Sequence, residues 1–60
     1  MSRLKQIRKQ KKLFLHEVAE KVGVTPQTVQ QMERHGIKTA STAKRYAAAL
    51  GVSWQEIIEA

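Results

Sequence analysis

The segment EVAEKVGVTPQTVQQME constrains the fold more than any other part of the chain. It contains two short stretches whose apolar residues recur at helical spacing, and Gly23 separates them. A glycine at this place can adopt the left-handed conformation that closes a helix. Thr25 is a good N-cap for the next helix, and Pro26 suits its first position because no N–H is needed there. The segment therefore predicts two helices joined by a tight turn, at about residues 15–22 and 26–34.

Five small or apolar residues around that turn form the pattern of a helix-turn-helix motif. Two helices that cross steeply need a small residue where their backbones touch and a positive φ in the turn. They also need one apolar residue in the turn and two on the second helix that pack back. The residues that meet these needs are Ala19, Gly23, Val24, Val29 and Met32. Each type is common alone, but the five in register are fairly specific for this motif.

The remaining segments also have helical periodicity, and none shows the alternation of a strand bounded by turns. A first helix is expected at residues 3–11, with Leu4 and Ile7 inward. A fourth helix, capped by Thr39 or Ser41, should end at Gly51. Its expected inward stripe is Ala40, Ala43, Ala47 and Leu50, with Tyr46 beside it.

The segment VSWQEI predicts a fifth helix that runs to the C-terminus. Ser53 and Glu56 have the spacing of a capping box, and Val52 with Ile57 has that of a hydrophobic staple. The chain of 60 residues is long enough for one domain, residues 1–60. The expected fold is therefore a compact all-α domain of five short helices.

Composition restricts the classes of function. The chain has no cysteine, which excludes a disulfide framework and a cysteine-ligated metal site. It has no apolar run of membrane-spanning length and no signal-peptide core, so we expect a cytoplasmic protein without a membrane partner.

The distribution of charge indicates a polyanionic partner. Eleven Lys and Arg residues oppose five acidic residues, for a net charge of +6. The cations form two blocks that contain no acid: Arg3, Lys5, Arg8, Lys9, Lys11 and Lys12, and then Arg34, Lys38, Lys44 and Arg45. Two such blocks around a less charged middle favour nucleic acid over a membrane surface.

At this point the chain resembles a known family. The segments RLKQIRKQKKLFLHEVAEKVGVTPQTVQQMER and STAKRYAAALGVSWQEII are similar to the lambda-repressor and Cro-like helix-turn-helix domains, the XRE family. The resemblance implies a five-helix domain that regulates transcription and whose third helix enters the major groove. It implies dimers on two-fold-related half-sites. It also implies an ion pair between Arg8 and Glu33 that holds the third helix to the scaffold.

The chain departs from the family pattern at two places before the second helix. Phe14 and Leu15 replace the usual Ser or Thr cap and the Gln that follows it, so a cap and a phosphate contact are lost. Phe14 either lies exposed beside DNA or folds back over Leu13. Lys12 replaces the usual glycine, so either the turn differs or Lys12 is strained.

The glutamines of the third helix are the expected readers of base sequence. Glutamine carries both a donor and an acceptor, and it pairs well with the N6 and N7 atoms of adenine. With the apolar residues of this helix inward, Gln27 and Gln31 share the opposite face, and they match the family's main base-contact positions. Thr28 and Pro26 lie near the helix start, where they can touch a thymine methyl group or a phosphate.

Phosphate contacts are expected on both sides of this helix, where they position the protein without reading sequence. The expected residues are Lys38, Thr39, Arg34, Gln30, Lys12 and Lys44. Lys11 is the alternative to Lys12, and Arg45 is the alternative to Lys44. Lys5 and Lys9 need not contact DNA, because solvated charges on the first helix also keep the protein soluble.

Three other functions are less well supported by the sequence. The stretch HEVAE has Glu20 where the zinc motif H-E-x-x-H needs its second His, and no triad or phosphate loop is present, so we expect neither an enzyme nor a metal or cofactor. An antitoxin of the same family would need an exposed apolar patch, for which Tyr46 and Trp54 are the candidates. RNA binding ranks below duplex DNA because interleaved aromatic residues are missing.

The expected partner is double-stranded DNA with two-fold-related half-sites. No further segment for dimerisation is evident, so the homodimer is expected to be weak or to form on DNA. Half-sites should then lie about 34 Å apart, one turn of the duplex. No small-molecule ligand is indicated.

Overall fold

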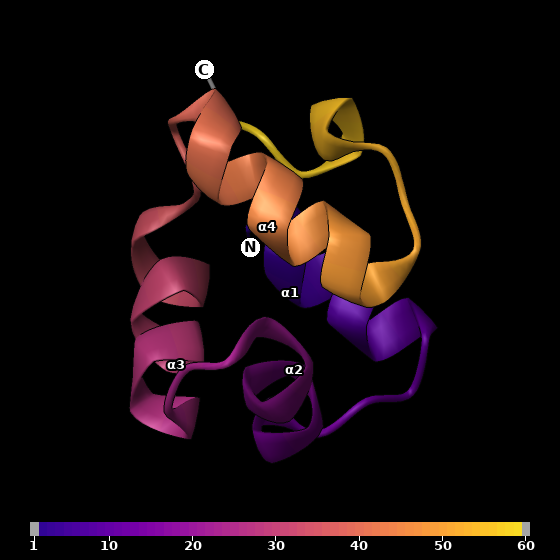
Figure 1. The fold of residues 1–60 in the computed structure, drawn as a ribbon, viewed down its shortest axis with the longest axis vertical. Coiled ribbons are helices and arrows are strands. Elements are labelled where there is room, and N and C mark those ends of the chain that lie inside the picture. The colour runs from indigo at the N-terminus through magenta and orange to yellow at the C-terminus, as the bar shows by residue number, and fades with distance from the viewer. Residues whose placement is uncertain (1, 60) are drawn as a thin grey trace.

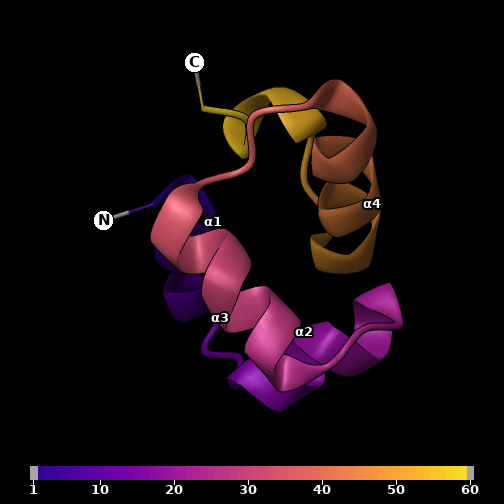
Figure 2. The same cartoon turned by 90° about the vertical axis from the view of Figure 1, so that its left-hand side faces the viewer.

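The computed structural model describes residues 2–59, which fold into α-helices and one short 3₁₀ turn without a β-strand. In chain order these elements are α1 (Arg3–Gln10), α2 (Leu15–Val22), α3 (Pro26–His35), α4 (Ala40–Leu50) and the 3₁₀ turn η1 (Trp54–Glu56). Figure 1 shows α2 and α3 as neighbours at one end of the molecule, with α4 above them. Figure 2 shows α3 crossing in front of α1, and the two helices are in contact. The all-α class is confirmed.

Side-chain caps explain where α1 and α3 begin. The buried Ser2 is the N-cap of α1, and its Oγ accepts a hydrogen bond from the Lys5 amide at 3.1 Å. Thr25 caps α3 in the same way, accepting from the Thr28 amide at 3.2 Å, and Pro26 occupies the first helical position. These bonds satisfy backbone N–H groups that have no partner inside the helix.

The core gathers apolar residues from the four α-helices and from the segments around residues 37 and 57. Its fully buried members include Leu4, Val18, Val29, Ile37 and Ile57. The burial of Ile37 is not predicted by the sequence, because a single Ile between Gly36 and Lys38 shows no periodicity.

The inward stripe of α4 is shorter than predicted. Ala43, Tyr46, Ala47 and Leu50 are buried, but Ala40 is exposed, and its predicted inward position is wrong. Ala40 is the first residue of α4, before the stripe reaches the core. Burial raises the pKa of the Tyr46 hydroxyl above its ordinary value, and the nearby Arg45 charge opposes this shift.

The predicted fifth helix is wrong. Its capping residues do interact, since the amide and Oγ of Ser53 donate to Glu56 Oε2 at 2.9 and 3.1 Å. However, only one 3₁₀ turn forms, and Ile58 then pairs with Ile37 in a parallel β-bridge. A single turn fixes several dihedral angles for few hydrogen bonds, so it does not propagate when a tertiary partner competes. That partner is the backbone before α4.

The C-terminal segment, residues 57–59, joins two distant parts of the chain. The Glu59 amide donates to the Ile37 carbonyl at 2.7 Å, which ties the segment to the loop between α3 and α4. The Glu59 carboxylate accepts from the Arg3 amide at 2.8 Å, and Arg3 Nη1 donates to the Ile58 carbonyl at 3.1 Å. A carboxylate is favourable there because the first N–H groups of a helix carry partial positive charge.

Gly36 makes this arrangement possible. Its backbone has φ 81° and ψ 155°, a conformation essentially restricted to glycine. A Cβ at this position would overlap the Glu59 carboxylate. The loop between α3 and α4 therefore depends on glycine for both its dihedral angles and its close contact with the C-terminal segment.

Candidate nucleic-acid interface

The face of α3 that points away from the core carries exposed polar side chains. Val29 is fully buried and Met32 is partly buried, whereas Gln27 and Gln31 are exposed. Residues four apart lie on one side of a helix, so these two amides occupy the same solvent-facing surface. The geometry leaves their donor and acceptor groups available to a partner outside the protein.

The other two predicted base contacts differ from each other. Pro26 is exposed at the start of α3. Thr28 is partly buried, and its hydroxyl lies 3.0 Å from the Thr25 hydroxyl. Thr28 Oγ1 is therefore already engaged at the helix start, which leaves mainly its methyl group for an outside contact.

The turn between α2 and α3 has the features of the predicted motif. Gly23 adopts φ 88°, and the amides of Gly23 and Val24 both donate to the Ala19 carbonyl, at 2.8 and 2.9 Å. Ala19 is 2% exposed and lies in the core with Val18, while Val24 packs against it. These bonds close α2 and direct the chain into α3.

Arg8 and Glu33 join α1 to α3. Nε and Nη2 of Arg8 donate to the two carboxylate oxygens of Glu33 at 2.6 and 3.2 Å. The side chains are only 12% and 6% exposed, so the pair is shielded from water. Arg8 Nη1 also donates to the Leu13 carbonyl at 2.9 Å, which connects the pair to the chain between α1 and α2. Arg8 thus links α3 to α1 and to the segment that leads into α2.

The residues predicted to contact phosphate are spread over several elements. Gln30 and Arg34 are exposed on α3, and Lys38 and Thr39 are exposed in the loop that follows it. Thr39 precedes α4, but its side chain makes no capping hydrogen bond. Lys44 is exposed on α4, and its ammonium group lies 5.6 Å from the centre of the Trp54 ring. This cation–π contact directs Lys44 toward η1.

Both departures from the family pattern have a structural outcome. Phe14 is 68% exposed and stacks on His16 with ring centroids 5.6 Å apart, so it does not fold back over Leu13. Glu17 accepts from the Phe14 amide at 2.8 Å, which supplies half of the missing capping interaction. Lys12 has φ 57°, so the turn keeps the conformation that favours glycine, and Lys12 is strained.

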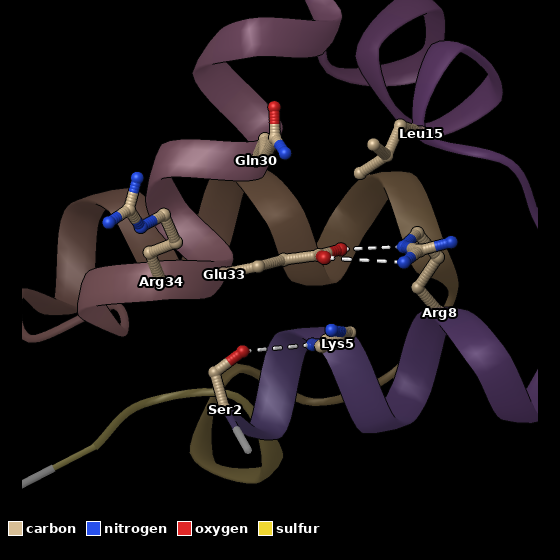
Figure 3. A pocket seen from close by; sticks show the side chains of 7 residues that line it. All are labelled: Ser2, Lys5, Arg8, Leu15, Gln30, Glu33 and Arg34. Atoms are coloured by element: carbon tan, nitrogen blue, oxygen red, sulfur yellow. Dashed lines mark hydrogen bonds and ion pairs between the residues drawn. The ribbon is translucent and has the colours of Figure 1, made fainter.

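An open pocket of about 310 Å³ lies between α1, α3 and the start of α2 (Figure 3). The residues that line it are Ser2, Lys5, Arg8, Leu15, Gln30, Glu33 and Arg34. Figure 3 shows Gln30 and Arg34 on the α3 side, Ser2 and Lys5 on the α1 side, and the Arg8–Glu33 pair between them. The sequence did not reveal this pocket, because its walls are distant in the chain and no motif links them.

The described residues contain neither a metal-binding cluster nor a membrane-spanning helix. Within residues 2–59, no cluster of three or more His or acidic side chains is arranged to hold a metal ion. None of the helices in this part of the chain has the length and apolar character needed to cross a membrane.

Comparison with known proteins gives one match. A family model described as helix-turn-helix matches residues 4–57, from α1 through the residue after η1. No curated protein and no solved structure matches the chain.

Proposed function

Since the chain belongs to the helix-turn-helix family, whose members are DNA-binding regulators and not enzymes, we propose that it is a sequence-specific transcriptional regulator. It acts in the cytoplasm as a Cro-like repressor that reads the major groove of double-stranded DNA with α3. The observation that carries this proposal is the exposure of Gln27 and Gln31 opposite the buried Val29. An α-helix fits the major groove, where each base pair presents a distinct pattern of donors and acceptors.

Base recognition requires that α3 be held rigidly. A side-chain amide can pair with adenine only if the helix presents it at a defined height and angle, and the Arg8–Glu33 pair supplies that constraint. Gln27 and Gln31 then make the principal base contacts. Pro26 and the Thr28 methyl group are placed near the helix start to meet a thymine methyl.

Phosphate contacts orient the protein on the duplex. Arg34 and Gln30 flank the base-reading face on α3, and Lys38 and Thr39 continue it into the following loop. Lys12 lies before α2 and serves the same role there. Lys44 contributes less, because its ammonium group is held over Trp54. Such contacts set affinity and its dependence on salt.

Two protomers are expected to bind related half-sites about 34 Å apart, as one turn of B-DNA requires. The homodimer is expected to be weak in solution and to form on DNA. If it neutralises about six phosphates, the logarithm of affinity should fall with the logarithm of salt concentration with a slope near −5.

An antitoxin of the same family is the alternative, and it has less support. Tyr46, one of two residues that could form an apolar patch for a toxin, is 3% exposed. Trp54, the other, is partly buried and covered by Lys44. Binding to a protein partner that does not respond to salt would favour this alternative.

Selection of bound sites from random duplex DNA at moderate salt tests the proposal. We expect a palindromic consensus that contains adenines. Gln27→Ala and Gln31→Ala should each relax one position of that consensus and weaken cognate binding by about 5- to 150-fold, since a good base contact discriminates by about 1–3 kcal/mol. Gln6→Ala, at an exposed glutamine on α1, is the matched control and should change neither. Equal competition by random and cognate duplexes would refute sequence-specific reading.

A further inference from the structure

The pocket between α1 and α3 has an excess of positive charge. Lys5, Arg8 and Arg34 line it with a single acid, Glu33. Both oxygens of Glu33 accept hydrogen bonds from Arg8, and this is the one ion pair formed within residues 2–59. Lys5 and Arg34 therefore line the pocket without an acidic partner among the described residues. Two uncompensated cations in one concave site attract an anion.

The donors come from opposite walls. Arg34 and Gln30 belong to α3, whereas Lys5 belongs to α1, and Leu15 closes the end toward α2 (Figure 3). An anion with several oxygens, such as a phosphate, can accept bonds from both walls across a wider gap than a single-atom anion such as chloride. Gln30 offers a neutral N–H₂ donor, and Arg34 can bind two oxygens at once. The volume of about 310 Å³ is at the small end for ligand pockets and accommodates a phosphate group.

We propose that this pocket binds one phosphate group, with Lys5 and Arg34 as its charged partners and Gln30 as its neutral donor. The favoured source is the DNA backbone beside the base-reading face of α3, and to that extent the inference rests on the proposed function. A free phosphate ester presents the same chemistry. In either case Lys5 is a ligand, which separates it from Lys9, the next lysine along α1.

Lys9 is the matched control for Lys5. The two residues lie one turn apart on α1 and carry the same charge, but Lys5 is partly buried and lines the pocket, whereas Lys9 is exposed and does not. Neither side chain forms an ion pair within the described residues. Lys5→Gln and Lys9→Gln should therefore both fold, which circular dichroism and urea unfolding would verify.

The first measurement is duplex affinity as a function of salt. Lys5→Gln should reduce the salt slope by about 1 per protomer and weaken binding uniformly across sequences, since it removes one phosphate contact. Lys9→Gln should leave the slope unchanged. Equal losses for the two variants would show that the charge of α1 acts at a distance and would overturn the DNA backbone as the source.

The second measurement needs no DNA. Inorganic phosphate is titrated into the protein at constant ionic strength while the Gln30 side-chain amide is followed by NMR, with chloride as the control anion. We expect a saturable shift with phosphate that Lys5→Gln and Arg34→Gln abolish and Lys9→Gln retains. This shift without a Lys5 effect on DNA binding would support the pocket and assign it to a free phosphate. A Lys5-specific loss of slope without the shift would support the pocket and assign it to the duplex.

The absence of both effects would overturn the inference. Failure of the wild-type chain to bind any duplex would instead refute the proposed function, and the phosphate titration would still decide whether the pocket binds an anion.

Discussion

The two ends of α1 are fastened to the rest of the molecule by different chemistry. Near its C-terminal end, Arg8 binds Glu33 of α3 in a pair that is 12% and 6% exposed. At its N-terminal end, the Arg3 amide and guanidinium bind residues 58 and 59 through hydrogen bonds that are exposed. Both attachments link residues far apart in the chain, but only the first excludes water.

This difference determines how much each attachment contributes to the free energy of unfolding. Removing one partner of a buried pair leaves an uncompensated charge in a poorly solvated site, which is strongly destabilising. Removing one partner of an exposed pair returns the other to water at little cost. The orientation of α3 therefore depends on the Arg8–Glu33 pair more than on the C-terminal segment, although both are geometrically well formed.

The largest expected effect tests the buried attachment. Glu33→Gln should lower the free energy of unfolding by about 3 kcal/mol, because Arg8 would keep its charge without a counter-charge. Urea unfolding measures this loss, with an osmolyte to populate the folded state if the variant is marginal. Arg8→Met and the double variant complete a thermodynamic cycle. A coupling energy near zero would show that the pair does not act as a unit.

The second effect tests the backbone beneath the C-terminal segment. Gly36→Ala should destabilise by about 2 kcal/mol, because alanine rarely adopts this conformation and its Cβ displaces the Glu59 carboxylate. Gly51→Ala is the control. Gly51 also has a positive φ, 71°, but nothing lies within 4 Å of its Cβ position, so the loss should be about 1 kcal/mol. Equal losses would mean that the contact with Glu59 is unimportant.

The third effect tests the strained turn between α1 and α2, next to the buried attachment. Lys12→Gly should raise the free energy of unfolding by about 0.5–1 kcal/mol, since the strain of φ 57° exceeds the entropy that glycine adds to the unfolded chain. Lys11→Gly should not stabilise, because Lys11 has φ −87°. Urea unfolding at high salt, where the lost charge matters less, compares the two. A stabilised Lys11 variant would point to charge repulsion as the cause.

The smallest effect tests the exposed attachment. Glu59→Ala should cost less than about 1 kcal/mol, because the exposed Arg3 amide that it releases can bind water. Glu59→Gln retains an acceptor for the Arg3 amide and should cost less still. The measurement is thermal unfolding at low and high salt. A loss from Glu59→Ala as large as that from Glu33→Gln would break the comparison between the two ends of α1.

Helix prediction succeeded where the signals were local. Thr25, Pro26 and Gly23 act within one or two turns of their own positions, so their sequence context was enough to place α2 and α3. It failed at residues 53–59, where an intact capping interaction was followed by pairing with Ile37. That competitor lies about twenty residues away and has no local signature.

The residues of the candidate site also fall into two groups, those that a local pattern predicts and those that only the tertiary structure brings together. Exposure of Gln27 and Gln31 follows from the apolar stripe on the opposite side of one helix. The Arg8–Glu33 pair was expected only through resemblance, because nothing in the spacing of these two residues indicates contact. The pocket was not expected at all, and Lys5 could not be distinguished from Lys9 until α1 was placed beside α3.

The amino-acid sequence by itself determined the helical periodicity, the caps, the turn at Gly23 and the polar face of α3, because these depend on neighbours within a few residues. Tertiary structure alone decided that Ile58 pairs with Ile37 in a β-bridge and that cations from α1 and α3 line one pocket. The physical reason is that such contacts join segments whose approach is set by burial of the whole core.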